Sequence, residues 1–106
     1  MTQLEKEVES LLRRKIEARG GMCLKWVCPG WAGVPDRICL LPGAKVFFVE
    51  TKRPSWGKTS ARQKWWADKI KSLGFEHYFI HNATDVRVLE KLLELEDEIH
   101  GTQTDL

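Results

Sequence analysis

The sequence predicts one mixed α/β domain, in which three helices cover a small central sheet in the order helix, three strands, helix, strand, helix. Three observations predict this fold class. Apolar residues recur at helical spacing near both ends of the 106-residue chain. Apolar runs separated by Pro and Gly fill residues 22–52. A further helical pattern and a fourth apolar run follow in residues 59–81.

The first helix is expected to follow Thr2, a candidate N-cap with Glu5 as its capping-box partner, and to end at Gly20-Gly21. Its apolar positions recur on one face: Leu4, Val8, Leu11, Leu12 and Ile16. Residues 22–28 alternate between two faces and are expected to form the first strand.

The next two strands, residues 36–41 and 45–52, are expected to pair through a turn at Pro42-Gly43. A loop rich in Pro and Gly precedes them. The run Val46–Val49 is apolar at every position, which is typical of a central strand covered on both faces.

In the second half of the chain, Thr59 or Ser60 is expected to cap a helix that Gly74 ends. The apolar stripe expected on this helix is Trp65, Trp66, Ile70 and Leu73. The segment between the third and fourth strands is long enough for a parallel crossover.

Residues 75–81 are expected to form the fourth strand, and Thr84 to cap the last helix. The buried face expected on this helix is Val86, Leu89, Leu92, Leu93 and either Leu95 or Ile99. We expect one domain over residues 1–101 and a flexible tail over residues 102–106.

Composition restricts the function classes. Three Cys without a C-x-x-C pair argue against a disulfide framework and against structural zinc. The apolar runs are too short to cross a bilayer, and acidic residues interrupt the N-terminus where a signal peptide would be apolar, so a cytoplasmic protein is expected.

The charge distribution is more informative than the net charge of +2. Residues 45–71 carry eight Lys and Arg against two acidic residues, a balance of +6, whereas residues 85–106 carry two against seven, a balance of −5. This asymmetry favours a polyanion partner for the middle of the chain. Two solvated helix faces would give the same pattern.

Asp36 and Glu50 lie at comparable distances on either side of the Pro42-Gly43 turn, so a hairpin would bring the two carboxylates together. Glu50 and Lys52 share one strand face. Converging carboxylates repel each other unless a cation or a proton intervenes, and Mg²⁺ accepts one or two such ligands together with phosphate oxygens. A surface ion pair would explain Glu-x-Lys alone equally well.

The motifs Gly33-Val34-Pro35-Asp36, Val46–Lys52 and Ser60-Ala61-Arg62-Gln63-Lys64 together resemble the VRR-NUC domain, a branch of the PD-(D/E)XK nuclease superfamily. The resemblance extends from Glu5 to the last helix. It implies a restriction-endonuclease-like core and a nuclease that depends on Mg²⁺ or Mn²⁺.

The resemblance also implies residue roles. Asp36 and Glu50 would hold the metal with the carbonyl of Thr51, Lys52 would be the catalytic lysine, and Gln63 would lie close by. A first-helix glutamate often completes such sites. Glu5 is our candidate and Glu9 the alternative, although Glu5 also fits the capping box.

This chain departs from the resemblance in the loop before Asp36. Many relatives carry basic residues there, whereas this chain has Trp31-Ala32. Trp31 would either stack on an exposed base or cover the edge of the core. The candidate DNA contacts are Lys45, Arg53, Lys58, Arg62, Lys64 and Trp31.

The expected function is that of a metal-dependent endodeoxyribonuclease that cleaves branched DNA such as Holliday junctions or flaps. The resemblance to stand-alone junction resolvases implies a homodimer, and a bacterial or phage-infected cell as its setting. The alternatives are a DNA-binding module without chemistry, which would have no reason to keep Asp36, Glu50 and Lys52 together, and a sequence-specific restriction endonuclease.

Overall fold

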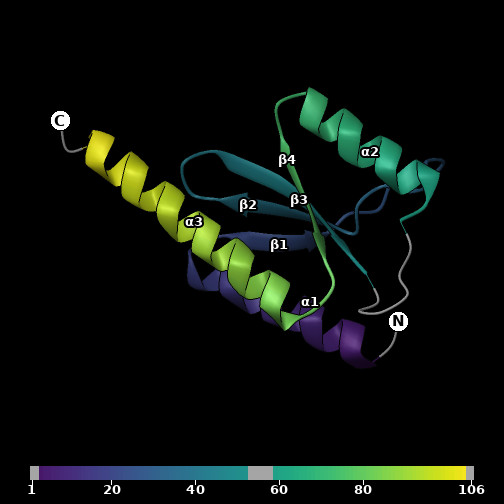
Figure 1. Cartoon of the computed structure of the whole chain (residues 1–106), viewed down its shortest axis with the longest axis horizontal. Helices are drawn as coiled ribbons and strands as arrows, with labels where there is room; N and C mark the ends of the chain where they lie inside the picture. The colour runs from purple at the N-terminus through teal and green to yellow at the C-terminus, as the bar shows by residue number, and fades with distance from the viewer. Residues whose placement is uncertain (1–2, 53–58, 105–106) are drawn as a thin grey trace.

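The computed structural model describes residues 3–52 and 59–104. Its elements follow the predicted order (Figure 1): α1 (Gln3–Ala18), β1 (Met22–Lys25), β2 (Arg37–Leu41), β3 (Lys45–Thr51), α2 (Ala61–Ser72), β4 (Glu76–Ile80) and α3 (Ala83–Thr104). Among the described residues, no helix is both long enough and apolar enough to pass through a bilayer.

The four strands form one sheet in the order β1-β2-β3-β4. The two hairpins β1–β2 and β2–β3 are antiparallel, and β3 pairs with β4 in parallel through the α2 crossover. The parallel pair confirms the predicted crossover. In the register of the second hairpin, Arg37 faces Val49, so the open end of this hairpin lies at Asp36 and Glu50.

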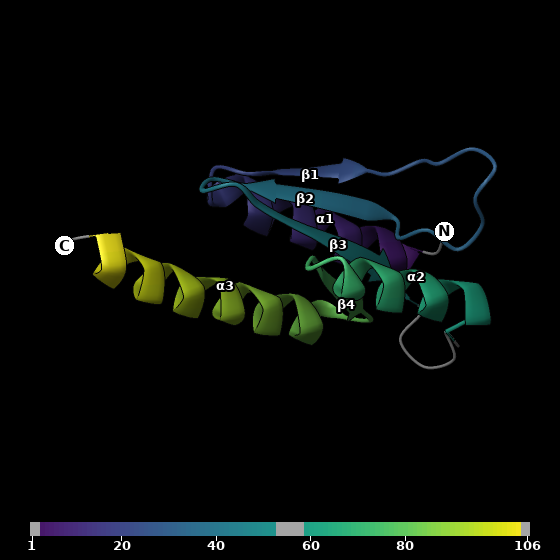
Figure 2. The same cartoon turned by 90° about the horizontal axis from the view of Figure 1, so that it is seen from above.

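The helices cover both faces of the sheet, as the apolar β3 run predicts. On one face, α1 and α3 pack against the inward residues of all four strands, and Figure 2 shows these two helices beside the sheet. On the other face, α2 packs against β4 and buries Ala67 and Ile70. Phe47, Phe48 and Val49 are consequently all buried.

The helix caps show where local reasoning succeeds and fails. Ser60 caps α2, and Gln63 completes a capping box with it. The Asn82 side chain accepts a hydrogen bond from the Asp85 amide, so Asn82 caps α3, and the prediction of Thr84 is wrong. The predicted cap Thr2 lies outside the described residues.

Several apolar positions predicted to be buried are exposed. Trp65 in α2 and Leu73, its C-cap residue, face solvent, and Ala67 takes the buried position between them. In α3, Leu92, Leu95 and Ile99 are exposed. The 22 residues of α3 span about 33 Å, whereas a five-residue strand such as β4 spans about 17 Å. The second half of α3 therefore extends past the sheet, as Figure 1 shows.

The end of α3 also differs from expectation, because the helix continues to Thr104 instead of ending near Gly101. The last two residues lie outside the described part of the chain, and the domain boundary stays a prediction. Cys23 and Cys39, by contrast, occupy core positions across the first hairpin, as small apolar side chains do.

His77 on β4 is buried, and no hydrogen-bond partner for its Nδ1 occurs among the described residues. Burial and the nearby Lys71 lower its pKa from 6.5 to about 4. The unfolded chain therefore binds a proton at higher pH than the folded chain does. We expect the contribution of His77 to stability to be complete above pH 6.5 and to fall by about 3 kcal/mol as the pH decreases towards 4.

Urea unfolding between pH 7.5 and 4 measures this loss. His77→Leu removes the titrating ring and should remove this contribution from the profile, whereas the control His81→Gln should retain it. An unchanged slope in His77→Leu would assign the acid sensitivity to other groups.

Candidate active site

The second hairpin brings Asp36 and Glu50 together. One residue beyond the Arg37–Val49 pair, the same register places Asp36 opposite Glu50. Pro35 is fully buried and fixes the chain immediately before Asp36. Burial and the neighbouring Asp36 carboxylate raise the pKa of Glu50 to about 8. This pair is thus unfavourable as two bare anions and favours a cation or a proton between its oxygens.

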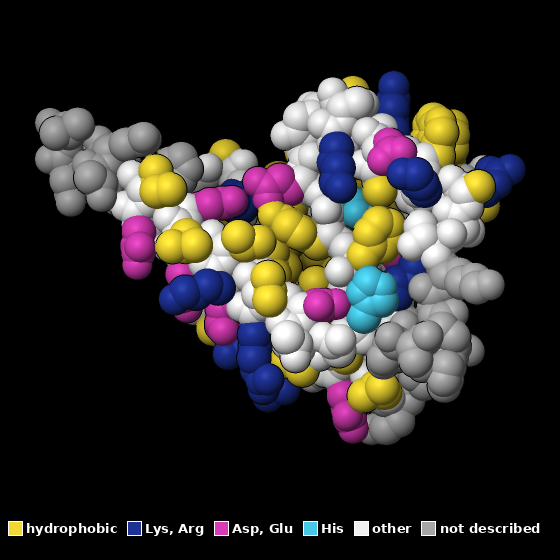
Figure 3. Space-filling model, in the orientation of Figure 1, with side chains coloured by type: hydrophobic (Ala, Val, Ile, Leu, Met, Phe, Trp, Pro, Cys, Tyr) yellow, Lys and Arg dark blue, Asp and Glu magenta, His cyan; other side chains and the backbone are white. Residues whose placement is uncertain are grey.

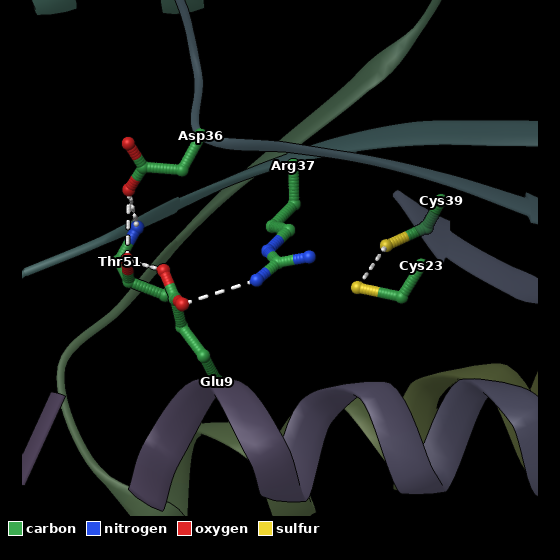
Figure 4. Close-up of polar contacts among 6 residues, drawn as sticks. All are labelled: Glu9, Cys23, Asp36, Arg37, Cys39 and Thr51. Atoms are coloured by element: carbon green, nitrogen blue, oxygen red, sulfur yellow. Dashed lines mark hydrogen bonds and ion pairs between the residues drawn. The ribbon is translucent and has the colours of Figure 1, made fainter. Parts of the chain in front are cut away.

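Thr51, the last residue of β3, connects Asp36 to α1 (Figure 4). Its amide donates to Asp36 Oδ2 at 3.0 Å. Its hydroxyl oxygen lies 2.7 Å from Asp36 Oδ2 and 3.1 Å from Glu9 Oε1. One hydroxyl therefore joins two carboxylates that arrive from different elements.

Glu9 is buried on α1 and pairs with Arg37, whose Nη2 lies 3.1 Å from Glu9 Oε2. Figure 4 shows Glu9 between Thr51 and Arg37. The guanidinium compensates the buried negative charge of Glu9, which would otherwise be costly. Sequence reasoning missed Arg37, although a cation on the core-facing side of β2, in line with Cys39, is itself a signal of a buried partner.

On the opposite face of β3, Gln63 connects α2 to the site. Its Nε2 donates to Glu50 Oε1 at 3.2 Å, and its Oε1 accepts from Lys52 Nζ. The same Oε1 accepts from the Ser60 amide at 3.0 Å in the capping box. Lys52 is itself buried, and its amide donates to the Ile80 carbonyl. The side-chain amide of Gln63, at the start of α2, thus links Glu50 to Lys52.

Four other predicted site residues lie on α1, β3 and α2. Glu5 lies one turn before Glu9 and is half-buried. Lys45 begins β3, at the end away from Glu50, and pairs with Glu96 of α3. Arg62 and Lys64 are exposed on the first turn of α2. Arg53 and Lys58 lie outside the described residues.

The loop carrying Trp31 is docked against the start of α2. The Trp66 indole donates to the Ala32 carbonyl at 3.1 Å. Gly33 has a φ of +82°, and a Cβ there would lie 2.7 Å from Arg62 Cβ. Figures 1 and 2 show this loop and the first turn of α2 at the same end of the molecule.

The donor chemistry at this site fits a hard divalent cation. Asp36 and Glu50 supply two carboxylates, and Mg²⁺ is commonly held by one or two carboxylates while phosphate and water complete its shell. Over residues 3–52 and 59–104, no three His, Cys, Asp or Glu side chains form a metal-binding group by themselves.

The chain is similar to a phage protein and to a solved domain structure. No protein-family model matches the chain. Over 50 residues it is 44% identical to "Putative nuclease p44" of Acyrthosiphon pisum secondary endosymbiont phage 1. This match covers 47% of the chain and 54% of the relative, so the chain spans about half the length of that protein.

A solved structure described as a VRR_NUC domain superposes on the chain with a TM-score of 0.79 at 24% identity. The superposition covers 85% of this chain and 97% of the other. At this identity the likeness concerns architecture. The chain therefore has the fold of a VRR_NUC domain, which confirms the restriction-endonuclease-like core that its motifs predict.

Proposed function

We propose that the chain is a metal-dependent nuclease that hydrolyses phosphodiester bonds in DNA. The convergence of Asp36 and Glu50, with Lys52 held beside Glu50 by Gln63, carries this proposal. The shared fold with a VRR_NUC domain and the similarity to a protein named as a nuclease support it.

Each residue has a role in this proposal. Asp36, Glu50 and the carbonyl of Thr51 would hold the cation. Mg²⁺ or Mn²⁺ at this position would supply Lewis-acid activation of the phosphate and of a water molecule. Lys52 places an ammonium next to Glu50, where it stabilises negative charge that builds on the phosphate. Gln63 orients both side chains and so acts as a positioning residue.

We propose that the glutamate of α1 that completes the site is Glu9 and not Glu5. The Glu9 carboxylate reaches Thr51, and through that hydroxyl it fixes the orientation of Asp36. Because Arg37 already neutralises part of its charge, Glu9 orders the end of β3 and leaves Asp36 and Glu50 as the principal anionic ligands.

DNA is the proposed partner, and branched DNA such as a junction or a flap is the proposed substrate. Figure 3 shows Lys and Arg side chains over α2, and Arg62 and Lys64 lie on the turn that also carries Gln63. A homodimer would present two sites to two strands. The exposed apolar row on α3, spaced by 4, 3 and 4 residues, supports a helix-to-helix interface: Val88, Leu92, Leu95 and Ile99.

The test is a cleavage assay on labelled four-way junction, flap, single-stranded and plain duplex DNA. Each substrate is incubated with Mg²⁺, with Mn²⁺ and with EDTA. We expect cleavage of branched substrates only with a divalent metal, and paired symmetric nicks in the junction if a dimer acts.

Other results of this assay would favour a different function or contradict the proposed metal site. Binding without product on every substrate would support a DNA-binding module. Cleavage at one sequence in plain duplex would support a restriction endonuclease. Product formation that persists in EDTA would contradict the metal site at Asp36 and Glu50.

A further inference from the structure

An aromatic pocket of about 250 Å³ lies between the loop after β1 and the first turns of α2. Its lining residues are Trp31, Ala32, Arg62, Trp65 and Trp66. Trp66 contacts both of the other indole rings. Trp31 and Trp65 each stand nearly perpendicular to the Trp66 ring, at interplanar angles of 81° and 89° and centroid distances of 5.7 and 5.2 Å.

The outer two rings do not serve the core, because 61% of Trp31 and 54% of Trp65 are exposed. Burying such rings would contribute far more to stability than leaving them in water. Trp66, by contrast, is half-buried and also contacts Trp26. The pocket is therefore lined by one half-buried ring, Trp66, and by two solvent-facing rings, Trp31 and Trp65.

The position of Trp31 is set before any ligand arrives. Two contacts hold its loop on α2, the Trp66–Ala32 hydrogen bond and the close approach of Gly33 to Arg62. A binding wall that is already in place does not lose the conformational entropy that a free loop would lose.

We propose that this pocket binds one unpaired nucleobase of the DNA substrate, with an adjoining phosphate on Arg62. A nucleobase offers a flat neutral ring for the tryptophan faces, and its backbone offers the anion that a guanidinium binds. Arg62 disfavours the cationic ligands that aromatic cages otherwise bind. The volume is below the roughly 300 Å³ at which pockets for whole small ligands begin, as a site for one base requires.

The base must be unpaired, because bases stacked in a duplex expose their edges and not their faces. The pocket also adjoins the proposed catalytic site, since Arg62 immediately precedes Gln63, which contacts Glu50 and Lys52. This inference rests on the proposed function and deepens it. The substrate is DNA with an unpaired nucleotide beside the cleaved phosphate, at a branch point, in a flap or in a single strand.

The first experiment measures binding in EDTA, where no metal-dependent cleavage occurs. The probe is a short single-stranded oligonucleotide containing 2-aminopurine, whose fluorescence is quenched by stacking. Trp31→Ala and Trp65→Ala should each weaken binding about tenfold and restore the fluorescence. Leu73→Ala, an exposed apolar change at the other end of α2, is the matched control and should bind as the unmodified protein does.

The second experiment tests whether one base of the oligonucleotide and the Trp31 ring contribute to the same contact. A single abasic nucleotide is moved along the oligonucleotide and binding is measured at each position. The unmodified protein should lose about tenfold in affinity at one position, and Trp31→Ala should lose nothing further there. Equal losses in both proteins, or no binding by the unmodified protein, would overturn the inference.

These outcomes are separable from those for the nuclease itself. If the unmodified protein cleaves branched DNA while Trp31→Ala binds the oligonucleotide normally, the pocket inference fails and the nuclease proposal stands. If one abasic position weakens binding to the unmodified protein but not to Trp31→Ala, and no substrate is cleaved, the pocket stands as a base-binding site and the catalytic proposal fails. Pocket variants that bind DNA normally but lose binding to a protein partner would show that the aromatic surface serves that partner and would overturn the inference.

Discussion

Replacing Asp36 with Asn is expected to lower the rate of DNA cleavage about a thousandfold, equivalent to about 4 kcal/mol of transition-state stabilisation. The amide oxygen of Asn still accepts the hydrogen bonds that Thr51 donates to Asp36, so the fold should persist. The change removes one of the two anions that hold the cation. Single-turnover cleavage of the preferred substrate at saturating Mg²⁺ measures the loss.

Asp68→Asn is the matched control, because Asp68 is an exposed α2 aspartate whose partner is Lys64. It should cleave at nearly the rate of the unmodified protein. Thermal unfolding should show Asp36→Asn to be as stable as the unmodified protein or more stable, since the repulsion between Asp36 and Glu50 is gone. An Asp36→Asn protein that is folded and fully active would exclude the proposed site.

Gly33→Ala is expected to destabilise the protein by about 2–4 kcal/mol. An alanine at a φ of +82° costs about 1–2 kcal/mol by itself. Its Cβ would also lie 2.7 Å from Arg62 Cβ and 2.9 Å from the Arg62 carbonyl carbon, so backbone has to move. The loop should then separate from α2 and carry Trp31 with it.

Gly30→Ala separates the cost of the positive φ from the cost of the collision with Arg62. Gly30 has a φ of +87°, and no atom lies within 4 Å of the added Cβ. It should show the cost of the backbone conformation without the collision. Urea unfolding measures both variants, and near-ultraviolet circular dichroism reports the Trp31–Trp66 contact. Equal destabilisation of the two variants would mean that the loop does not depend on its contact with Arg62.

The sequence was sufficient to predict the pairing of Asp36 with Glu50. The apolar run of β3 identifies the central strand, and the turn at Pro42-Gly43 fixes the register within a residue. A register slip would turn Phe47 and Val49 out of the core, so burial specifies the same alignment that brings the carboxylates together.

The sequence alone could not distinguish Glu5 from Glu9 as the glutamate that contacts Thr51. The two residues are four apart and therefore lie on one face of α1, each next to apolar positions. Which of them reaches Thr51 depends on how far α1 lies along the sheet, and that is set by packing of the whole core. The exposed Leu92, Leu95 and Ile99 have a similar cause, because helical periodicity identifies a face but not where the sheet beneath it ends.

Gln63 has a further consequence for how the proposed active site responds to heating. One side chain completes the capping box of α2 and also orders Glu50 and Lys52. Helices fray at their first turns. Because Gln63 lies in the first turn of α2, opening of this turn would remove its side-chain amide from Glu50 and Lys52 while the sheet remains intact. If the chain has the proposed nuclease activity, heat inactivation would precede global unfolding, and the stability of a single helical turn would set the upper temperature for cleavage.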